Sequence, residues 1–229
     1  MFKKALASMG LVLSLALTAA AQGPAILDRI VATVNGSPIL QSDWEEAVRY
    51  EAFIAGHPLD QVTGGERKAA LDRLIDQELL REQMQASDFP QATEDEIRQR
   101  VEQVRKQYPG AETDSGWQSI LAEYNLTESE LRGRIALQLN LMRLVDARLR
   151  PNVSIDNKSI ESYYSQELLP QLRQQGAKEV PLADVTPKIK ELLTQRKVSE
   201  LLTAWLQNLR AGSEIHTMLP QPAPGDQAQ

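Results

Sequence analysis

The longest amphipathic pattern in the chain runs from residue 128 to residue 149, where apolar side chains recur at helical spacing. One face, at about 100° per residue, carries Leu131, Ile135, Leu139, Met142, Val145 and Leu149. Leu137, Leu141 and Leu144 widen the apolar arc to more than half of the circumference. A helix this apolar is normally central and packed on several sides. The alternative is that part of the arc stays open as a groove for an apolar ligand.

A second long hydrophobic pattern, at 187–210, moves from one face of the expected helix to the other along its length. Ile189, Leu192 and Leu193 share one face. Roughly the opposite face carries Val198, Leu201, Leu202, Trp205, Leu206 and Leu209. A helix whose two halves bury opposite faces should bridge two bodies or kink. The same switch allows a homodimer formed by exchange of this terminal helix.

Short β-branched segments are expected to form a small sheet. Residues 30–34 and 38–40 predict a hairpin around Asn35-Gly36, the strongest short turn signal in the chain. A further strand is expected at 215–219, directly after the last helix. Because two strands alone are marginal in water, the three should pair and tie both ends of the chain together.

Capping-box sequences mark the helix starts, with a Ser or Thr followed three residues later by Glu. They begin at Ser42, Thr63, Thr93 and Thr127, and Thr186-Pro187 predicts a further start with proline at the first helical position. Breaks rich in glycine and proline separate these patterns. The expected helices are 43–55, 66–86, 94–107, 116–124, 128–149, 157–174 and 187–210, so the fold class is mainly α.

The first 21 residues predict a secretory signal peptide. Lys3 and Lys4 provide positive charge, residues 11–17 form a brief apolar region interrupted by Ser14, and Ala19-Ala20-Ala21 offers a cleavage site before Gln22. A retained membrane anchor is the alternative, although the apolar stretch is shorter than the ~20 residues that a spanning helix needs. We therefore expect an exported protein, with no stable membrane insertion once the signal is cleaved.

Composition argues against several classes of protein. The formal net charge of −6 repels phosphate backbones, so no nucleic-acid partner is expected. There is no cysteine, so the exported chain must rely on its core, without disulfides or a thiolate metal site. The last ten residues, 220–229, are rich in Pro, Gln, Ala and Gly and are expected to be disordered.

No catalytic or metal-binding pattern stands out in the sequence. His57 lies in a Gly-Pro turn and His216 in the expected last strand, so the two histidines are far apart. There is no G-x-S-x-G motif and no phosphate-binding glycine pattern. The carboxylates of residues 94–96 fit the first turn of a helix, where they meet the helix dipole. We expect no enzyme activity, no metal and no cofactor.

Several segments resemble SurA-type periplasmic chaperones and their parvulin-containing relatives. The segment from Asp28 to Asp43 is similar to the opening of that family, and 71–80 and 131–149 resemble two helices of its N-terminal module. Residues 196–211 with Ile215-His216 are similar to the closing helix and strand. The resemblance implies a multi-helix SurA-N-like (trigger-factor-C-like) chaperone module in the periplasm, with a small sheet.

The chain departs from these relatives where they carry a parvulin prolyl-isomerase domain. Residues 151–185 are too few for that domain, since small domains need about 50 residues. The expected organisation is a signal peptide (1–21), a helical module (22–150), a connector (151–186), a closing helix and strand that pack back on the module (187–219), and a tail (220–229).

The resemblance implies an ATP-independent holdase for unfolded or newly translocated polypeptides, such as outer-membrane or secreted proteins. Methionines and aromatic side chains suit this task because they re-pack around different partners. The candidate client-binding residues are Met84, Phe89, Tyr108, Trp117, Tyr124, Met142, Tyr163, Tyr164 and Trp205. Each of them, taken alone, is also explained as an ordinary core or interface residue. A degenerate peptidyl-prolyl isomerase and a single-partner assembly adaptor remain alternatives.

Overall fold

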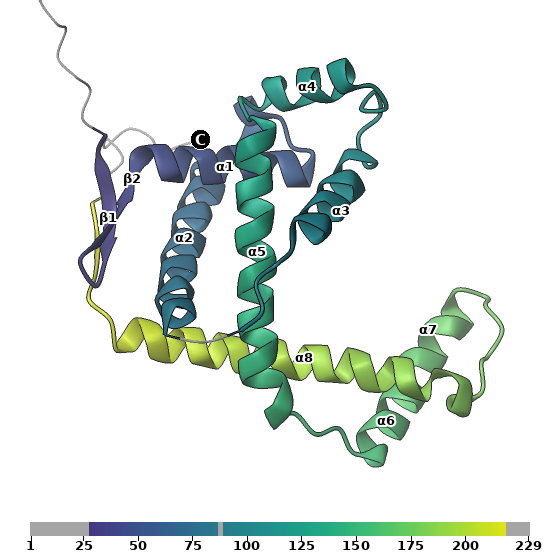
Figure 1. Cartoon of the computed structure of the whole chain (residues 1–229). Coiled ribbons are helices and arrows are strands. Elements are labelled where there is room, and N and C mark those ends of the chain that lie inside the picture. The colour runs from purple at the N-terminus through teal and green to yellow at the C-terminus, as the bar shows by residue number, and fades with distance from the viewer. Residues whose placement is uncertain (1–27, 87–88, 219–229) are drawn as a thin grey trace, which may run out of the picture.

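The computed structural model describes residues 28–86 and 89–218, which form a helical body, a small sheet and an outer helical arm (Figure 1). The predicted signal peptide, the tail at 220–229 and Leu219 of the expected last strand lie outside the described residues. A search of the described helices found none with the length and apolar character needed to cross a membrane.

The sheet joins the two ends of the described chain, as predicted. Strands β1 (Ile30–Val34) and β2 (Ser37–Leu40) form the hairpin, and β3 (Ile215–Thr217) pairs with the other edge of β1, giving the antiparallel order β2-β1-β3. Asn35 and Gly36 connect β1 to β2 with φ angles of 48° and 85°. Both angles are positive, which is why an Asn-Gly pair favours this tight turn.

Helices make up most of the remaining described chain, which confirms the mainly α fold class. The body contains α1 (Gln41–Ala55), η1 (Leu59–Gln61), α2 (Gly64–Gln85), α3 (Glu94–Arg105), α4 (Asp114–Glu123), α5 (Glu128–Leu149) and η2 (Arg150–Asn152). The arm contains α6 (Asn157–Tyr163), η3 (Tyr164–Leu168) and α7 (Leu169–Gln174), and the long α8 (Leu182–Ala211) returns from it to the sheet. The predicted 157–174 helix is interrupted by the wide π-helical turn η3, just before Pro170, which lacks a backbone donor.

Three of the four predicted capping boxes are present. At α2, the Thr63 hydroxyl accepts from the Glu66 N–H at 3.2 Å, and the Glu66 carboxylate accepts from the Thr63 N–H at 2.7 Å. The pairs Thr93–Glu96 and Thr127–Glu130 repeat this exchange at α3 and α5. Each pair satisfies two backbone donors that a helix start would otherwise leave unpaired.

The capping box predicted at Ser42 is wrong, because β2 runs directly into α1 and the helix begins at Gln41. The Asp43 carboxylate accepts from the Leu40 N–H at 3.0 Å instead. The Ser42 hydroxyl is hydrogen-bonded to Asp28, just before the first strand.

The helix caps should make the free energy of unfolding depend on pH below neutrality. Hydrogen bonds from the threonine N–H and hydroxyl groups hold the pKa values of Glu66, Glu96 and Glu130 below their ordinary range. This stabilisation is complete above the unfolded value of about 4.3 and is lost as the pH falls through the lower folded values. We therefore expect the free energy of unfolding, measured by urea titration from pH 7 to pH 3, to fall less steeply in a Glu66→Gln, Glu96→Gln, Glu130→Gln variant. Equal slopes for the two proteins would contradict this expectation.

The last helix begins earlier than predicted. It starts at Leu182 and contains Pro187, whereas Thr186-Pro187 had indicated the start. Proline at this place cannot donate a hydrogen bond to the carbonyl four residues earlier, and its ring also crowds that carbonyl. The Thr186 hydroxyl donates to the Leu182 carbonyl at 2.7 Å within this first turn. The predicted connector 151–186 therefore includes the beginning of α8.

Two hydrophobic clusters hold the body together. One joins α1, α3, α4 and the first half of α5 around Phe53, Trp117 and Leu121. The other joins the sheet to α2 through residues such as Val34 and Ile75, with Leu209 of α8 packed against it. The space between these clusters is where α2, α5 and α8 contact one another.

Candidate functional site

A groove of about 460 Å³ lies among α1, α2, α5 and α8. Its larger aliphatic side chains and its methionine come from three of these helices: Leu74 and Leu80 of α2, Leu141, Met142 and Val145 of α5, and Val198 and Leu202 of α8. Tyr50 of α1 contributes an aromatic ring to the same lining. This volume lies within the range of sites that bind small molecules or a few side chains.

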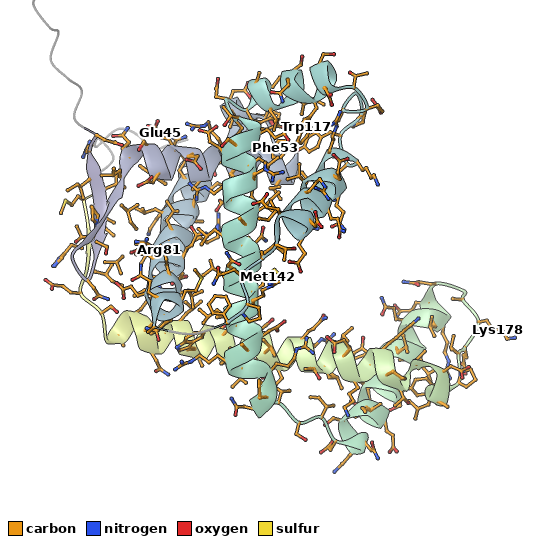
Figure 2. All side chains as sticks on the ribbon, viewed as in Figure 1. Glu45, Phe53, Arg81, Trp117, Met142 and Lys178 are labelled. Atoms are coloured by element: carbon orange, nitrogen blue, oxygen red, sulfur yellow. The ribbon has the colours of Figure 1, made fainter. Side chains whose placement is uncertain are left out.

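The groove exists because α5 is more apolar than its neighbours can cover. Leu131 and Ile135 are buried in the cluster around Phe53, and Leu144 and Val145 are buried farther along the helix. Met142, however, remains 57% exposed. Figure 2 shows it on the lower part of α5, away from the upper cluster. Both interpretations of the 128–149 pattern therefore apply. One part of its apolar arc is packed in the core, and another part lines the open groove.

Every charged side chain that lines the groove has an oppositely charged partner. Arg73 of α2 forms an ion pair with Glu51 of α1, through two hydrogen bonds. The Nε atom of Arg134 lies 2.7 Å from the carboxylate of Glu46. These pairs leave the groove polar at its edges but without free charge on α1 and α2.

At the α8 end of the groove, Arg150 is paired twice. Its guanidinium lies 3.5 Å from the Asp146 carboxylate and 2.9 Å from the carboxylate of Glu191. The second contact links the end of α5 to α8. Hydrogen bonds from Arg150 hold the pKa of Glu191 below its ordinary value, so this link persists at neutral pH.

Neutral amides add hydrogen-bonding capacity to the groove. Gln77 of α2 and Gln138 of α5 both line it, as does Gln195 of α8. The Tyr50 hydroxyl donates to Gln138 Oε1 at 3.1 Å. Burial raises the pKa of Tyr50, so this hydroxyl stays protonated and keeps Gln138 oriented.

The α8 wall of the groove is attached mainly by partly exposed contacts. Within the described chain, Ile189 and Val198 are its only buried residues, although the helix is 30 residues long. The Arg148 guanidinium lies 4.7 Å from the centre of the Trp205 ring. Arg210 Nε donates to the Asp76 carboxylate of α2 at 2.5 Å. A wall attached in this way can shift more easily than one buried in a core.

Three of the nine candidate client-binding residues belong to the core around Phe53. Trp117 and Tyr124 are buried, and Tyr108 stacks on the Phe53 ring with 4.7 Å between ring centres. The Tyr108 hydroxyl also donates to the Phe53 carbonyl oxygen. These three side chains are therefore core residues, because their rings pack between α1, α3 and α4.

The remaining candidates are dispersed, and Met142 is the one that lines the groove. Tyr163 and Tyr164 lie in the arm, where Arg196 is 5.0 Å from the Tyr163 ring centre and the Tyr164 hydroxyl donates to the Val180 carbonyl at 2.7 Å. Trp205 lies on α8 and contacts Arg148 of α5. Met84, at the end of α2, and Phe89, in the α2–α3 link, are partly buried outside the groove lining.

The aliphatic residues of the groove are not among the candidates chosen from methionine and aromatic side chains. Two signals in the sequence did point toward them. Leu141 widens the apolar arc of α5, and Val198 and Leu202 belong to the second stripe of α8. Only the packing of these helices shows that parts of both stripes face the same space.

Across residues 28–86 and 89–218, no group of three or more His, Asp or Glu side chains is arranged to hold a metal ion. His57 lies between α1 and α2, and His216 lies in β3, where its Nε2 is 2.9 Å from the Glu214 carboxylate. The groove is therefore the main candidate site.

Two comparisons with known proteins address the family of this chain. A comparison with curated proteins gave no match. A model described as the SurA-like N-terminal domain matches residues 5–145, which is more than half of the chain. The match includes α1 and α2 and ends within α5, so it covers three walls of the groove but not α8. The chain therefore belongs to the SurA-like N-terminal domain family, a family of chaperone type.

Proposed function

We propose that this protein is an ATP-independent periplasmic chaperone that holds unfolded or newly translocated polypeptides in the groove among α1, α2, α5 and α8. The observation that carries the proposal is an open apolar groove containing Met142, which is 57% exposed. Membership of the SurA-like N-terminal domain family supports the same function. Its clients would be exported proteins, including outer-membrane or secreted proteins.

Binding in this groove needs no covalent chemistry. Apolar side chains of an unfolded client would leave water and contact the leucines, valines and methionine of the groove, which is favourable by roughly 25 cal/mol per Å² of apolar surface buried. The net affinity is modest because the client loses conformational freedom when it binds. Modest affinity suits a holdase, since the client must leave again in order to fold.

A charge placed in the groove should abolish this activity. We expect Met142→Glu to weaken client binding at least about tenfold, because the carboxylate must lose water when an apolar segment covers it. The measurement is suppression of light scattering when a chemically unfolded client is diluted from denaturant into the full mature protein without ATP. The matched control is Met218→Glu, which changes another exposed methionine outside the groove.

The outcomes separate the proposal from its rivals. Suppression by the wild type and by Met218→Glu, but not by Met142→Glu, supports the groove. Failure of the wild type to suppress aggregation of several unrelated clients would contradict the holdase function and favour a single-partner adaptor. Catalysis in a proline-tetrapeptide assay would show that the protein is also an isomerase. The predicted exchange of α8 between two copies stays a prediction, which the molar mass in solution tests.

A further inference from the structure

We infer that the groove selects a client segment without acidic side chains, in extended conformation, and binds its main chain through the side-chain amides of Gln77 and Gln138. This inference rests on the proposed function and names the part of a client that the groove recognises. It would make recognition largely independent of sequence, because every residue type has the same main chain.

The preference for a segment without acidic side chains follows from the ion pairs. All five charged residues in the lining, Glu51, Arg73, Arg134, Asp146 and Arg150, have an oppositely charged partner, and Arg150 is shared between Asp146 and Glu191. An acidic client side chain would therefore find no free cation there and would meet the surplus negative charge of these two carboxylates. Burying it against Leu141 and Met142 would leave it unpaired in apolar surroundings, which is strongly unfavourable.

The two amides provide unused hydrogen-bonding groups on two walls of the groove, α2 and α5. Gln138 accepts from Tyr50 with its oxygen, so its NH₂ group remains available. Gln77 is half-buried, and its side chain has no hydrogen-bond partner among the described residues. Each amide would become buried when an apolar segment fills the groove, and a buried amide without a partner is costly.

An extended client segment satisfies these amides better than a helical one. A helix pairs its own N–H and C=O groups internally and presents only side chains to a groove. An extended chain presents free N–H and C=O groups, which match the carbonyl and NH₂ of a glutamine amide. Its side chains alternate from side to side, so one set can enter the apolar lining while the main chain stays at the level of the amides.

The experiment compares two fluorescent peptides on the full mature protein. Both have the same uncharged apolar sequence, but one is N-methylated at alternate residues, which removes main-chain donors. We expect the wild type to bind the N-methylated peptide about tenfold more weakly. In a Gln77→Met, Gln138→Met variant this ratio should fall close to one. Gln207→Met, which changes an exposed glutamine outside the groove, should keep the wild-type ratio.

A third peptide, with one central glutamate, tests the charge preference and should bind the wild type at least tenfold more weakly than the uncharged peptide. Equal binding of the methylated and unmethylated peptides, or an unchanged ratio in the double glutamine variant, would overturn main-chain recognition. Equal binding of the glutamate peptide would overturn the preference for segments without acidic side chains. Binding of all peptides that is insensitive to Met142→Glu would instead contradict the groove itself, and with it the proposed function.

Discussion

Replacement of Phe53 by alanine should lower the free energy of unfolding by about 3–5 kcal/mol, because it removes the centre of the upper core. Phe53 is fully buried and contacts three aromatic rings. It stacks on Tyr108 at 4.7 Å, meets Tyr124 edge-on at 5.4 Å and lies 6.0 Å from Trp117. The cavity would open where α1, α3 and α4 meet, and no single neighbour can fill it.

Urea unfolding followed by circular dichroism measures this effect. Phe53→Leu is the matched control and should lose clearly less stability, since it keeps much of the volume. Tyr108→Phe isolates the hydrogen bond to the Phe53 carbonyl and should lose about 1 kcal/mol. Burial raises the pKa of Tyr108 to about 12, so this donor stays protonated at ordinary pH. A loss below about 1 kcal/mol for Phe53→Ala would contradict the central role of this ring.

Truncation after Gly212 should be the second most damaging change, with a loss of about 2–4 kcal/mol. It removes β3 and its contacts with the hairpin. These include the 2.8 Å hydrogen bonds from the Asn35 N–H to the Glu214 carbonyl and from the Met218 N–H to the Val31 carbonyl. It also uncovers Val34 and leaves a two-stranded hairpin, which is marginal in water.

The matched control for this truncation ends at Met218 and keeps β3. Thermal and urea unfolding of the two shortened proteins should therefore differ, with the longer one close to the full chain. If both proteins unfold at the same urea concentration as the full chain, β3 does not hold the ends together. Loss of stability in both would show that residues 219–229 make the essential contribution.

The fold could be predicted from local signals wherever one residue pair decides the geometry. Asn35-Gly36 identified the hairpin, and Thr63, Thr93 and Thr127 identified three helix starts through their capping glutamates. The start of α8 could not be found in this way, because proline is typical of a first turn but also tolerated a few residues later, as at Pro187. The start of α1 was displaced by the strand that precedes it.

The candidate site was less predictable, since residue type does not distinguish an exposed ring from a buried one. Trp117 and Met142 were equally good candidates by composition, yet Trp117 is 1% exposed and Met142 is 57% exposed. The difference arises because α1, α3 and α4 pack around Trp117, whereas Met142 lies in the open groove among α1, α2, α5 and α8. The open part of the α5 arc was therefore visible in the sequence as a possibility, and its position was not.

The arm has a further consequence for how this protein can change. The chain leaves the body at the end of α5 and re-enters it along α8 (Figure 1). The Arg150–Glu191 pair joins these two stems. An insertion with adjacent stems can grow, shrink or be replaced without altering the path of the chain through the body. The segment carrying α6, η3 and α7 is thus an insertion site. Another domain can replace it beside the groove while the sheet still joins the two ends of the body.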